Sequence, residues 1–266
     1  MNAIPPLIEP PVNRRRWWIH LILLGAYVLV AGVVGLRRVK SQTPALTHTV
    51  GGLLFVCAME LLVFGCVFGL ACYASRATRD DLRLRWRGKF KPVLLGVGYS
   101  LAFRLVIAII FIMATTALML THLVTPDSLQ AYVKTNRPDV ETLLDVTAMS
   151  HNLAYYWLTL TLVSFLVAGL REELWRSAFL AGLKALWPQY FDSRLGQVGA
   201  VFVVAIFFAF AHLPLGLIGV VNAGFLGVGL GLIMVFHRSI WPAVIAHGFF
   251  DMASMAMIPW AMQHYQ

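Results

Sequence analysis

The chain has 266 residues, of which 59% are hydrophobic and 12% are charged, with a mean hydropathy of +0.76 and a formal net charge of +9. This composition excludes a soluble globular protein and indicates a chain that crosses a membrane several times. The basic residues cluster between apolar runs, where anionic lipid headgroups account for them, so the charge does not indicate nucleic acid as a partner.

Apolar runs predict an all-α, polytopic membrane protein with about seven transmembrane helices. Several runs reach the roughly 20 residues that a helix needs to cross a bilayer. The fourth run is longer, so it is tilted, broken, or a surface helix followed by a span. Pro214 disfavours helix at Leu213, so the fifth helix should kink or end just past His212. By residue number the expected spans are 17–36, 50–74, 93–120, 152–187, 197–212, 215–236 and 239–260.

Basic residues outside the spans predict the orientation in the membrane. With the N-terminus inside, the inner segments hold 13 Lys and Arg residues and the outer segments hold 5. Because cytoplasmic loops carry the excess of positive charge, this balance favours a cytoplasmic N-terminus, with the cluster from Arg37 to Lys40 as the one feature against it. In the basic loop 75–91 apolar residues alternate with arginines, so we expect an extended segment lying on a lipid surface.

Polar and small residues inside the other spans suggest helix contacts. Glu60 lies in the second span and Arg104 in the third, and we expect them to form a structural salt bridge across two helices. In the sixth span, Gly227-x-x-x-Gly231 permits close helix packing but says nothing about chemistry.

The stretch from Arg171 to Arg176 places two adjacent carboxylates inside a long apolar run. Ionisable residues at membrane depth are costly, so they are candidates for a functional site. At helical spacing Arg176 can pair with Glu172, four residues earlier, or with Glu173, three residues earlier. One acid is then held ionised while the other is free to take a proton. The alternative is a solvated helix end at the membrane surface, and this stretch alone leaves both open.

Two histidines and an aspartate add polar groups to later apolar helices. His247 and Asp251 are four residues apart, on one face of the last span, and His212 ends the fifth. With a rise of 1.5 Å per residue, Glu173 and His212 lie roughly 21 and 22 Å from the inner ends of their helices, and His247 roughly 12 Å. All three can therefore line one cavity that opens inward, although these depths alone do not prove contact.

Such a set of carboxylates and imidazoles contains the parts of a peptide-bond hydrolase, with or without a metal. A carboxylate in a low-dielectric pocket is a usable general base near neutral pH. Imidazoles can orient the attacking water, donate hydrogen bonds to an oxyanion, or bind Zn²⁺. Asp251 can orient His247. No G-x-S-x-G, H-E-x-x-H or phosphate-loop motif competes with this interpretation.

In their order along the chain, these residues resemble the motifs of the CPBP family, which comprises the type II CAAX prenyl endopeptidases and the bacterial Abi and bacteriocin-processing proteins. The matching segments are Glu172-Glu173-x-x-Arg176 for E-E-x-x-x-R, Phe208-x-x-x-His212 for F-x-x-x-H, and His247-x-x-x-Asp251 for H-x-x-x-N/D. The first match is loose, because it takes Glu172 as the lead residue and the next three as those between it and the arginine. The resemblance covers about residues 150–255.

The resemblance implies an enzyme, an intramembrane endopeptidase with its cavity among the C-terminal helices. By this likeness Glu172 is the base that activates water. Glu173 and Arg176 support that base. His212 and His247 hold the water or the oxyanion.

By the same likeness, Asp251 takes a place that Asn often occupies. Because ionised Asp only accepts hydrogen bonds, Asp251 must be protonated, act through His247, or help to bind a metal. Family members are described both as metalloproteases and as metal-free glutamate proteases. We expect a metal-free enzyme without a cofactor, and the alternative is Zn²⁺ bound by His212, His247 and Glu172.

These interpretations divide the chain into a disordered basic tail (1–16), N-terminal transmembrane helices (17–123) and a catalytic transmembrane domain of CAAX-protease type (150–260). The expected partners are the lipid bilayer and a peptide or protein substrate, and the expected location is a bacterial plasma membrane.

Two other functions stay open. One is a transporter or channel with a Glu, Arg and His path for ions or protons, although no inverted repeat is visible. The other is a membrane scaffold that binds partner helices without cleaving them.

Overall fold

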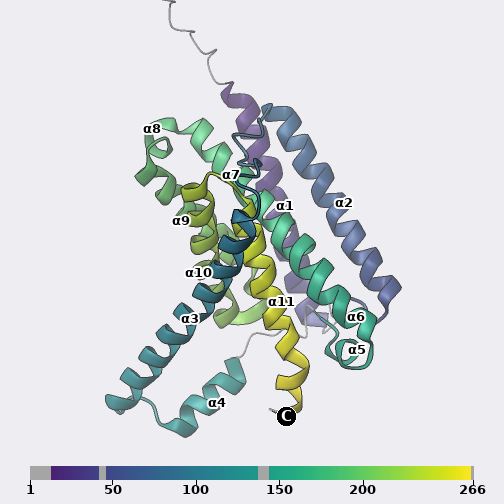
Figure 1. Ribbon diagram of the computed structural model, residues 1–266, viewed down its shortest axis with the longest axis vertical. Coiled ribbons are helices and arrows are strands. Elements are labelled where there is room, and N and C mark those ends of the chain that lie inside the picture. The colour runs from purple at the N-terminus through teal and green to yellow at the C-terminus, as the bar shows by residue number, and fades with distance from the viewer. Residues whose placement is uncertain (1–12, 42–45, 137–143, 265–266) are drawn as a thin grey trace, which may run out of the picture.

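The computed structural model describes residues 13–41, 46–136 and 144–264, which contain helices and no strand (Figure 1). The all-α prediction is therefore confirmed for this part of the chain. In chain order the elements are α1 (Arg14–Ser41), α2 (Val50–Ser75), α3 (Lys91–Leu120), α4 (Pro126–Asn136), α5 (Val146–His151), α6 (Leu153–Leu158), the π-helix η2 (Thr159–Leu170), α7 (Arg171–Leu186), α8 (Pro188–Phe191), α9 (Arg194–Ala211), the 3-10 turn η3 (Leu213–Leu215), α10 (Gly216–His237) and α11 (Trp241–His264).

Six helical stretches of the described chain are long and apolar enough to cross a membrane. They are α1, α2, α3, the run from α6 to α7, α9, and the run from η3 to α10. Helix α11 has 24 residues, but polar side chains that include His247 and Asp251 make it less apolar than these six. The prediction of about seven spans is thus close to what length and composition give.

The fourth predicted span is one continuous helical run of 34 residues, Leu153–Leu186. Its middle part, η2, is a π-helix, a rare form with hydrogen bonds from i to i+5 that often occurs at functional sites. The Ser164 hydroxyl donates to the carbonyl oxygen of Thr159, five residues back, at 3.2 Å. Of the three expected alternatives, the run is continuous, and it carries the adjacent acids directly after η2, in the first turn of α7.

Helix α7 lies at the centre of the bundle, because eleven of its sixteen residues are buried. His20 of α1 fastens the N-terminal helices to it. The Nδ1 atom of His20 lies 3.0 Å from the carbonyl oxygen of Ala71 on α2, and its Nε2 atom lies 3.0 Å from that of Ala178 on α7. The indole of Trp175 also donates to the carbonyl oxygen of Leu24 at 3.1 Å. These bonds hold α1 and α2 against the helix that bears the adjacent acids.

Glycines allow the close approaches between helices that the fold requires. A Cβ atom at Gly169 of η2 would lie 3.0 Å from the carbonyl oxygen of Val244 on α11, and one at Gly248 would overlap the Phe165 ring. The predicted Gly227-x-x-x-Gly231 contact is also present, since Cβ atoms at these positions would meet side chains of α9 at 2.7–3.3 Å. The absence of side chains at these positions therefore lets α11 pack against η2 and α10 against α9.

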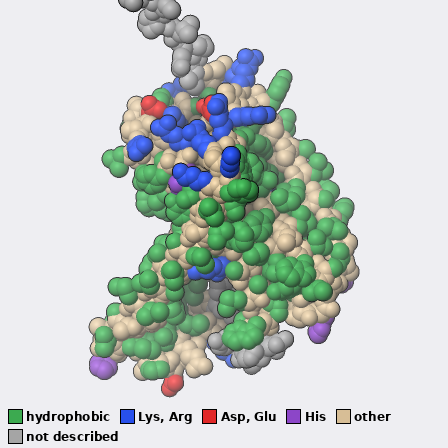
Figure 2. Space-filling model, viewed as in Figure 1, with side chains coloured by type: hydrophobic (Ala, Val, Ile, Leu, Met, Phe, Trp, Pro, Cys, Tyr) green, Lys and Arg blue, Asp and Glu red, His purple; other side chains and the backbone are tan. Residues whose placement is uncertain are grey.

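The basic side chains gather at one end of the bundle, above flanks covered by hydrophobic side chains (Figure 2). In Figure 1 this end holds the start of α1, the segment 76–90, helix α8, and the connection from α10 to α11. These are the segments that the sequence assigned to one side of the membrane.

The segment 76–90 lies across the end of the bundle, so the expectation of an extended strip on a lipid surface is wrong. Leu82 is buried in the core. The carbonyl oxygens of residues 82 to 85 accept, in this order, hydrogen bonds from Ser177 Oγ, the Ile240 amide, Trp241 Nε1 and Ser239 Oγ, at 2.6–3.0 Å. The segment therefore ties α7 to the buried start of α11.

Two further expectations concern segments at the margin of the described residues. The predicted tail 1–16 lies outside them up to residue 12, but α1 already begins at Arg14. The residues between the third and fourth predicted spans, 121–151, contain α4 and α5, and residues 137–143 lie outside the described ranges.

Replacing Ser177 with alanine should destabilise the fold. The substitution leaves the buried carbonyl oxygen of Leu82 without its donor, which costs about 1–3 kcal/mol in free energy of unfolding. The measurement is denaturant unfolding of purified protein in detergent. The matched control is Ser254→Ala, because that hydroxyl bonds only to Phe250 of its own helix and should change stability by less than about 0.5 kcal/mol. Equal effects of both changes would contradict the proposed tie.

Candidate active site

A buried ion pair forms the centre of the candidate site. Arg176 donates to Glu173 Oε1 one turn earlier on α7, and the side chains of both residues are at most 1% exposed. The same Oε1 atom accepts a hydrogen bond from His247 Nδ1 of α11 at 2.9 Å. Of the two acids considered from the sequence, Glu173 is thus the one that is paired with Arg176.

Phe208 packs between the charged and imidazole groups of the site. The Arg176 guanidinium lies 4.3 Å from the centre of the Phe208 ring, a cation–π contact. The centre of this ring is 4.5 Å from that of His212 and 6.4 Å from that of His247. The sequence analysis identified Phe208 as a motif residue, and the structure shows that its ring packs against the side chains of Arg176, His212 and His247.

Glu172 lies at the open side of this pair. Its side chain is 18% exposed, and its Oε1 atom accepts a hydrogen bond from Arg171 Nη2 at 3.0 Å. Its other oxygen, Oε2, is 3.8 Å from His247 Nε2. On the other side, Asp251 Oδ2 is 3.6 Å from the same nitrogen. His247 therefore contacts three carboxylates, and its Nε2 atom faces the two that are partly exposed.

His212 is held at the end of α9 beside this cluster. Its Nδ1 atom donates to the carbonyl oxygen of Phe208 at 2.8 Å, so the remaining nitrogen for chemistry is Nε2. The charges of Glu172, His247 and Arg176 all act on His212. The structure thus brings the six candidate residues together, five through polar contacts and His212 through Phe208.

The expected salt bridge between Glu60 and Arg104 is wrong, because each residue has other partners. Arg171 Nη1 binds Glu60 Oε2 at 2.7 Å. Arg104 donates to the carbonyl oxygens of Phe249 and Phe250 and lies 4.5 Å from the centre of the Phe250 ring. Arg104 also interacts electrostatically with Asp251. Both residues therefore belong to the surroundings of the candidate site.

The candidate ligands do not form a metal site as they stand. Within the described residues, no group of three or more His, Cys, Asp and Glu side chains is arranged to hold a metal ion. Of the two nitrogens of His247, Nδ1 is already bound to Glu173 Oε1, at 2.9 Å. Zn²⁺ on His212, His247 and Glu172 would require these side chains to move.

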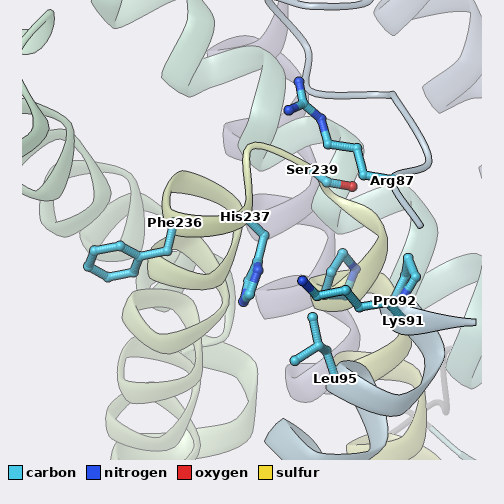
Figure 3. A pocket seen from close by; sticks show the side chains of 8 residues that line it. Arg87, Lys91, Pro92, Leu95, Phe236, His237 and Ser239 are labelled. Atoms are coloured by element: carbon cyan, nitrogen blue, oxygen red, sulfur yellow. The ribbon is translucent and has the colours of Figure 1, made fainter.

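A cavity of about 210 Å³ lies away from these residues, at the basic end of the bundle (Figure 3). It is enclosed by α3, the end of α10 and the start of α11, and is lined by Arg87, Lys91, Pro92, Leu95, Phe236, His237, Ser239 and Pro242. None of the six candidate residues lines it. This cavity is therefore a feature of the basic end and separate from the candidate active site.

Comparison with known proteins gives one family. Residues 153–253 match the family model described as type II CAAX prenyl endopeptidase Rce1-like. Over these residues, which are less than half of the chain, the protein is similar to the Rce1-like family. The match confirms the resemblance to the CPBP family and supports a hydrolase of the CAAX prenyl protease type. No curated protein and no solved structure matches the chain.

The Rce1-like segment contains all six candidate residues, whereas Glu60 and Arg104 lie before it. Its first motif departs from E-E-x-x-x-R, since counting back from Arg176 places the two acids at positions 171 and 172. Arg171 then stands where the first acid is expected. Glu172 is included whether the pattern is aligned on the acids or on the arginine.

Replacing Arg176 with methionine should strongly destabilise the protein. It leaves Glu173 as a buried charge without its guanidinium partner, which costs roughly 3–5 kcal/mol. The double variant Glu173→Gln/Arg176→Met removes both charges and should recover much of the loss. Denaturant unfolding in detergent measures the effect.

The control for this change is Arg85→Met, which breaks the exposed pair with Asp80. It should cost about 0–1 kcal/mol, because solvent screens exposed pairs. If Arg176→Met proved no more harmful than Arg85→Met, the pair with Glu173 would not be the centre of the site.

Proposed function

We propose that the protein is an intramembrane endopeptidase that hydrolyses a peptide bond with water activated by Glu172. The observation that carries this proposal is the difference between the adjacent acids. Glu173 is fully buried and bound to Arg176 and His247, whereas Glu172 is partly exposed and faces His247 Nε2. Because a general base must reach the water that it deprotonates, Glu172 is the suitable acid.

The balance of charges around the site supports a protonated His247. The cluster contains four carboxylates and three guanidinium groups, those of Glu60, Glu172, Glu173, Asp251, Arg104, Arg171 and Arg176. One protonated imidazole would make the sum neutral, and a neutral cluster is favoured where solvent is excluded. We assign this proton to His247, whose ring contacts three of the carboxylates.

In the proposed reaction, water gives a proton to Glu172 and its oxygen attacks the carbonyl carbon of the peptide. The carbonyl electrons move onto oxygen, and the N–H of His247 Nε2 stabilises the resulting oxyanion. The proton then passes from Glu172 to the leaving nitrogen as the C–N bond breaks, which restores the carboxylate. His212 Nε2 orients the water, because its other nitrogen is occupied by Phe208. Asp251 maintains the charge and orientation of His247.

The proposed partner is a peptide or a protein substrate that is associated with the membrane. The matched family is described as CAAX prenyl endopeptidases. We make no prenyl group part of the mechanism, because the residues assigned to the reaction all act on the peptide bond itself. The positions of cleavage in a mixture of substrates would define the specificity.

Cleavage of a peptide library by purified protein in detergent tests this function. Wild type should cleave, and Glu172→Gln should lose at least about 100-fold in rate, the contribution typical of a general base. Asp127→Asn, an exposed residue of α4, is the control and should retain full activity. Mass spectrometry of the fragments identifies the cleaved bonds. Full activity of Glu172→Gln would remove this residue as the base.

A chelator arm of the same experiment tests the metal-free form of the proposal. We expect wild type to retain activity in a strong chelator, because in this mechanism Glu172 activates the water and His247 stabilises the oxyanion without a metal. Loss of activity that added Zn²⁺ restores would establish a metalloprotease instead. Absence of cleavage by wild type under every condition would overturn the endopeptidase proposal.

We further propose that the N-terminus lies in the cytoplasm, since the basic residues gather at the end of the bundle where α1 begins (Figure 2). A reporter that is active only outside the cytoplasm should therefore be active after residue 122, in the turn between α3 and α4, and inactive after residue 192, between α8 and α9. The reverse pattern would invert the orientation.

A further inference from the structure

We propose that Tyr27 and Glu60 are positioning residues for Glu172 and act on it through Arg171; this inference rests on the proposed function. Arg171 Nη2 binds Glu172 Oε1 at 3.0 Å. Its Nη1 atom binds Glu60 Oε2 at 2.7 Å and approaches the Tyr27 hydroxyl oxygen at 3.4 Å. We call these four residues the Arg171 network.

The Arg171 network joins three helices, and two of them lie outside the Rce1-like segment. Tyr27 comes from α1, Glu60 from α2, and Arg171 and Glu172 from the first turn of α7. The two N-terminal helices also contact each other here, because the centres of the Tyr27 and Phe64 rings are 5.5 Å apart. Helices α1 and α2 therefore supply a hydroxyl group and a carboxylate that both contact Arg171, the residue that binds the candidate base Glu172.

Glu60 limits how strongly Arg171 can hold Glu172. An arginine paired with Glu172 alone would stabilise the ionised carboxylate and so weaken it as a base. Glu60 makes the shorter contact with the same guanidinium, and it therefore shares the positive charge that would otherwise act on Glu172 alone. The side chains of Arg171 and Glu172 are both only 18% exposed, so solvent screens these charges incompletely.

A purely structural tie between α2 and α7 is the competing explanation. It predicts a loss of stability without a change in pH dependence, whereas the positioning role predicts both a slower reaction and a moved pH profile. The charged and titratable groups that act on or through Glu172 are Arg171 of its own helix, Tyr27 of α1, Glu60 of α2, His212 of α9, and His247 and Asp251 of α11.

The test compares the pH dependence of peptide cleavage by wild type and Glu60→Gln. Removing the charge of Glu60 leaves the guanidinium of Arg171 to bind Glu172 alone, which holds this carboxylate more tightly and weakens it as a base. We expect the acidic limb of the rate profile to move down by about one pH unit. We also expect kcat to fall about tenfold. KM should change little, because Glu60 binds Arg171 and is not placed to contact the peptide.

Three further variants make this test specific. Glu60→Asp keeps the charge and should restore much of the activity, and Tyr27→Phe removes only a weak contact and should give a fall of about twofold. Met59→Leu, at an exposed position next to Glu60 on α2, should behave as wild type. In an Arg171→Gln background, Glu60→Gln should add little, because the two residues act as one unit.

The outcomes separate this inference from the proposed function. If wild type cleaves and Glu60→Gln keeps both its kcat and its pH profile, the inference is overturned and the proposed function stands. If Glu60→Gln is slow but its profile is unmoved and its thermal unfolding midpoint is lowered, the tie is structural only and the inference is overturned. If Glu60→Gln does not fold, the kcat of Tyr27→Phe decides the question, and a kcat equal to that of wild type overturns the inference. Absence of cleavage by wild type overturns both.

Discussion

The buried contact among Arg176, Glu173 and His247 is the constraint on which the rest of the site depends. A carboxylate and a guanidinium without solvent are stable only with close partners, so α7 cannot shift or rotate freely against α11. This contact leaves His247 Nε2 facing Glu172 and Asp251, because Nδ1 is already engaged with Glu173. A pair that is buried for structural reasons thereby fixes which acid and which ring nitrogen stay available for chemistry.

The surrounding helices serve this contact through small residues and backbone bonds. Gly169 and Gly248 let η2 and α11 approach closely enough for the buried contact to form. At the basic end, the carbonyl oxygens of residues 82–85 bind donors from α7 and from the start of α11. Because both helices are fixed at this end as well as at the ion pair, the five candidate residues that they carry are held in place, as a catalytic arrangement requires.

The sequence was sufficient to predict the helical fold, and it singled out six residues that the structure brings together, because charges at membrane depth are costly and stand out in an apolar chain. It did not predict their pairing. Glu60 and Arg104 were expected to bind each other, yet Glu60 binds Arg171 and Arg104 binds backbone carbonyls of α11. Spacing along one helix limits partners to residues three or four apart, whereas partners on other helices depend on rotation and tilt. The π-helix before Arg171 changes that rotation, and its sequence does not reveal it.

The depths estimated from the sequence show the same limit in another form. The estimated depths of Glu173 and His247 differed by about 9 Å, on the assumption that all helices begin at the same level in the membrane. In the structure their side chains are 2.9 Å apart. Helix α11 begins at Trp241, and Ile240 just before it is fully buried beneath the segment 76–90. The helix thus begins below the surface of the bundle, so a residue only six positions from its start reaches the depth of Glu173. A loop that covers a helix start can therefore align residues that helix length alone would separate.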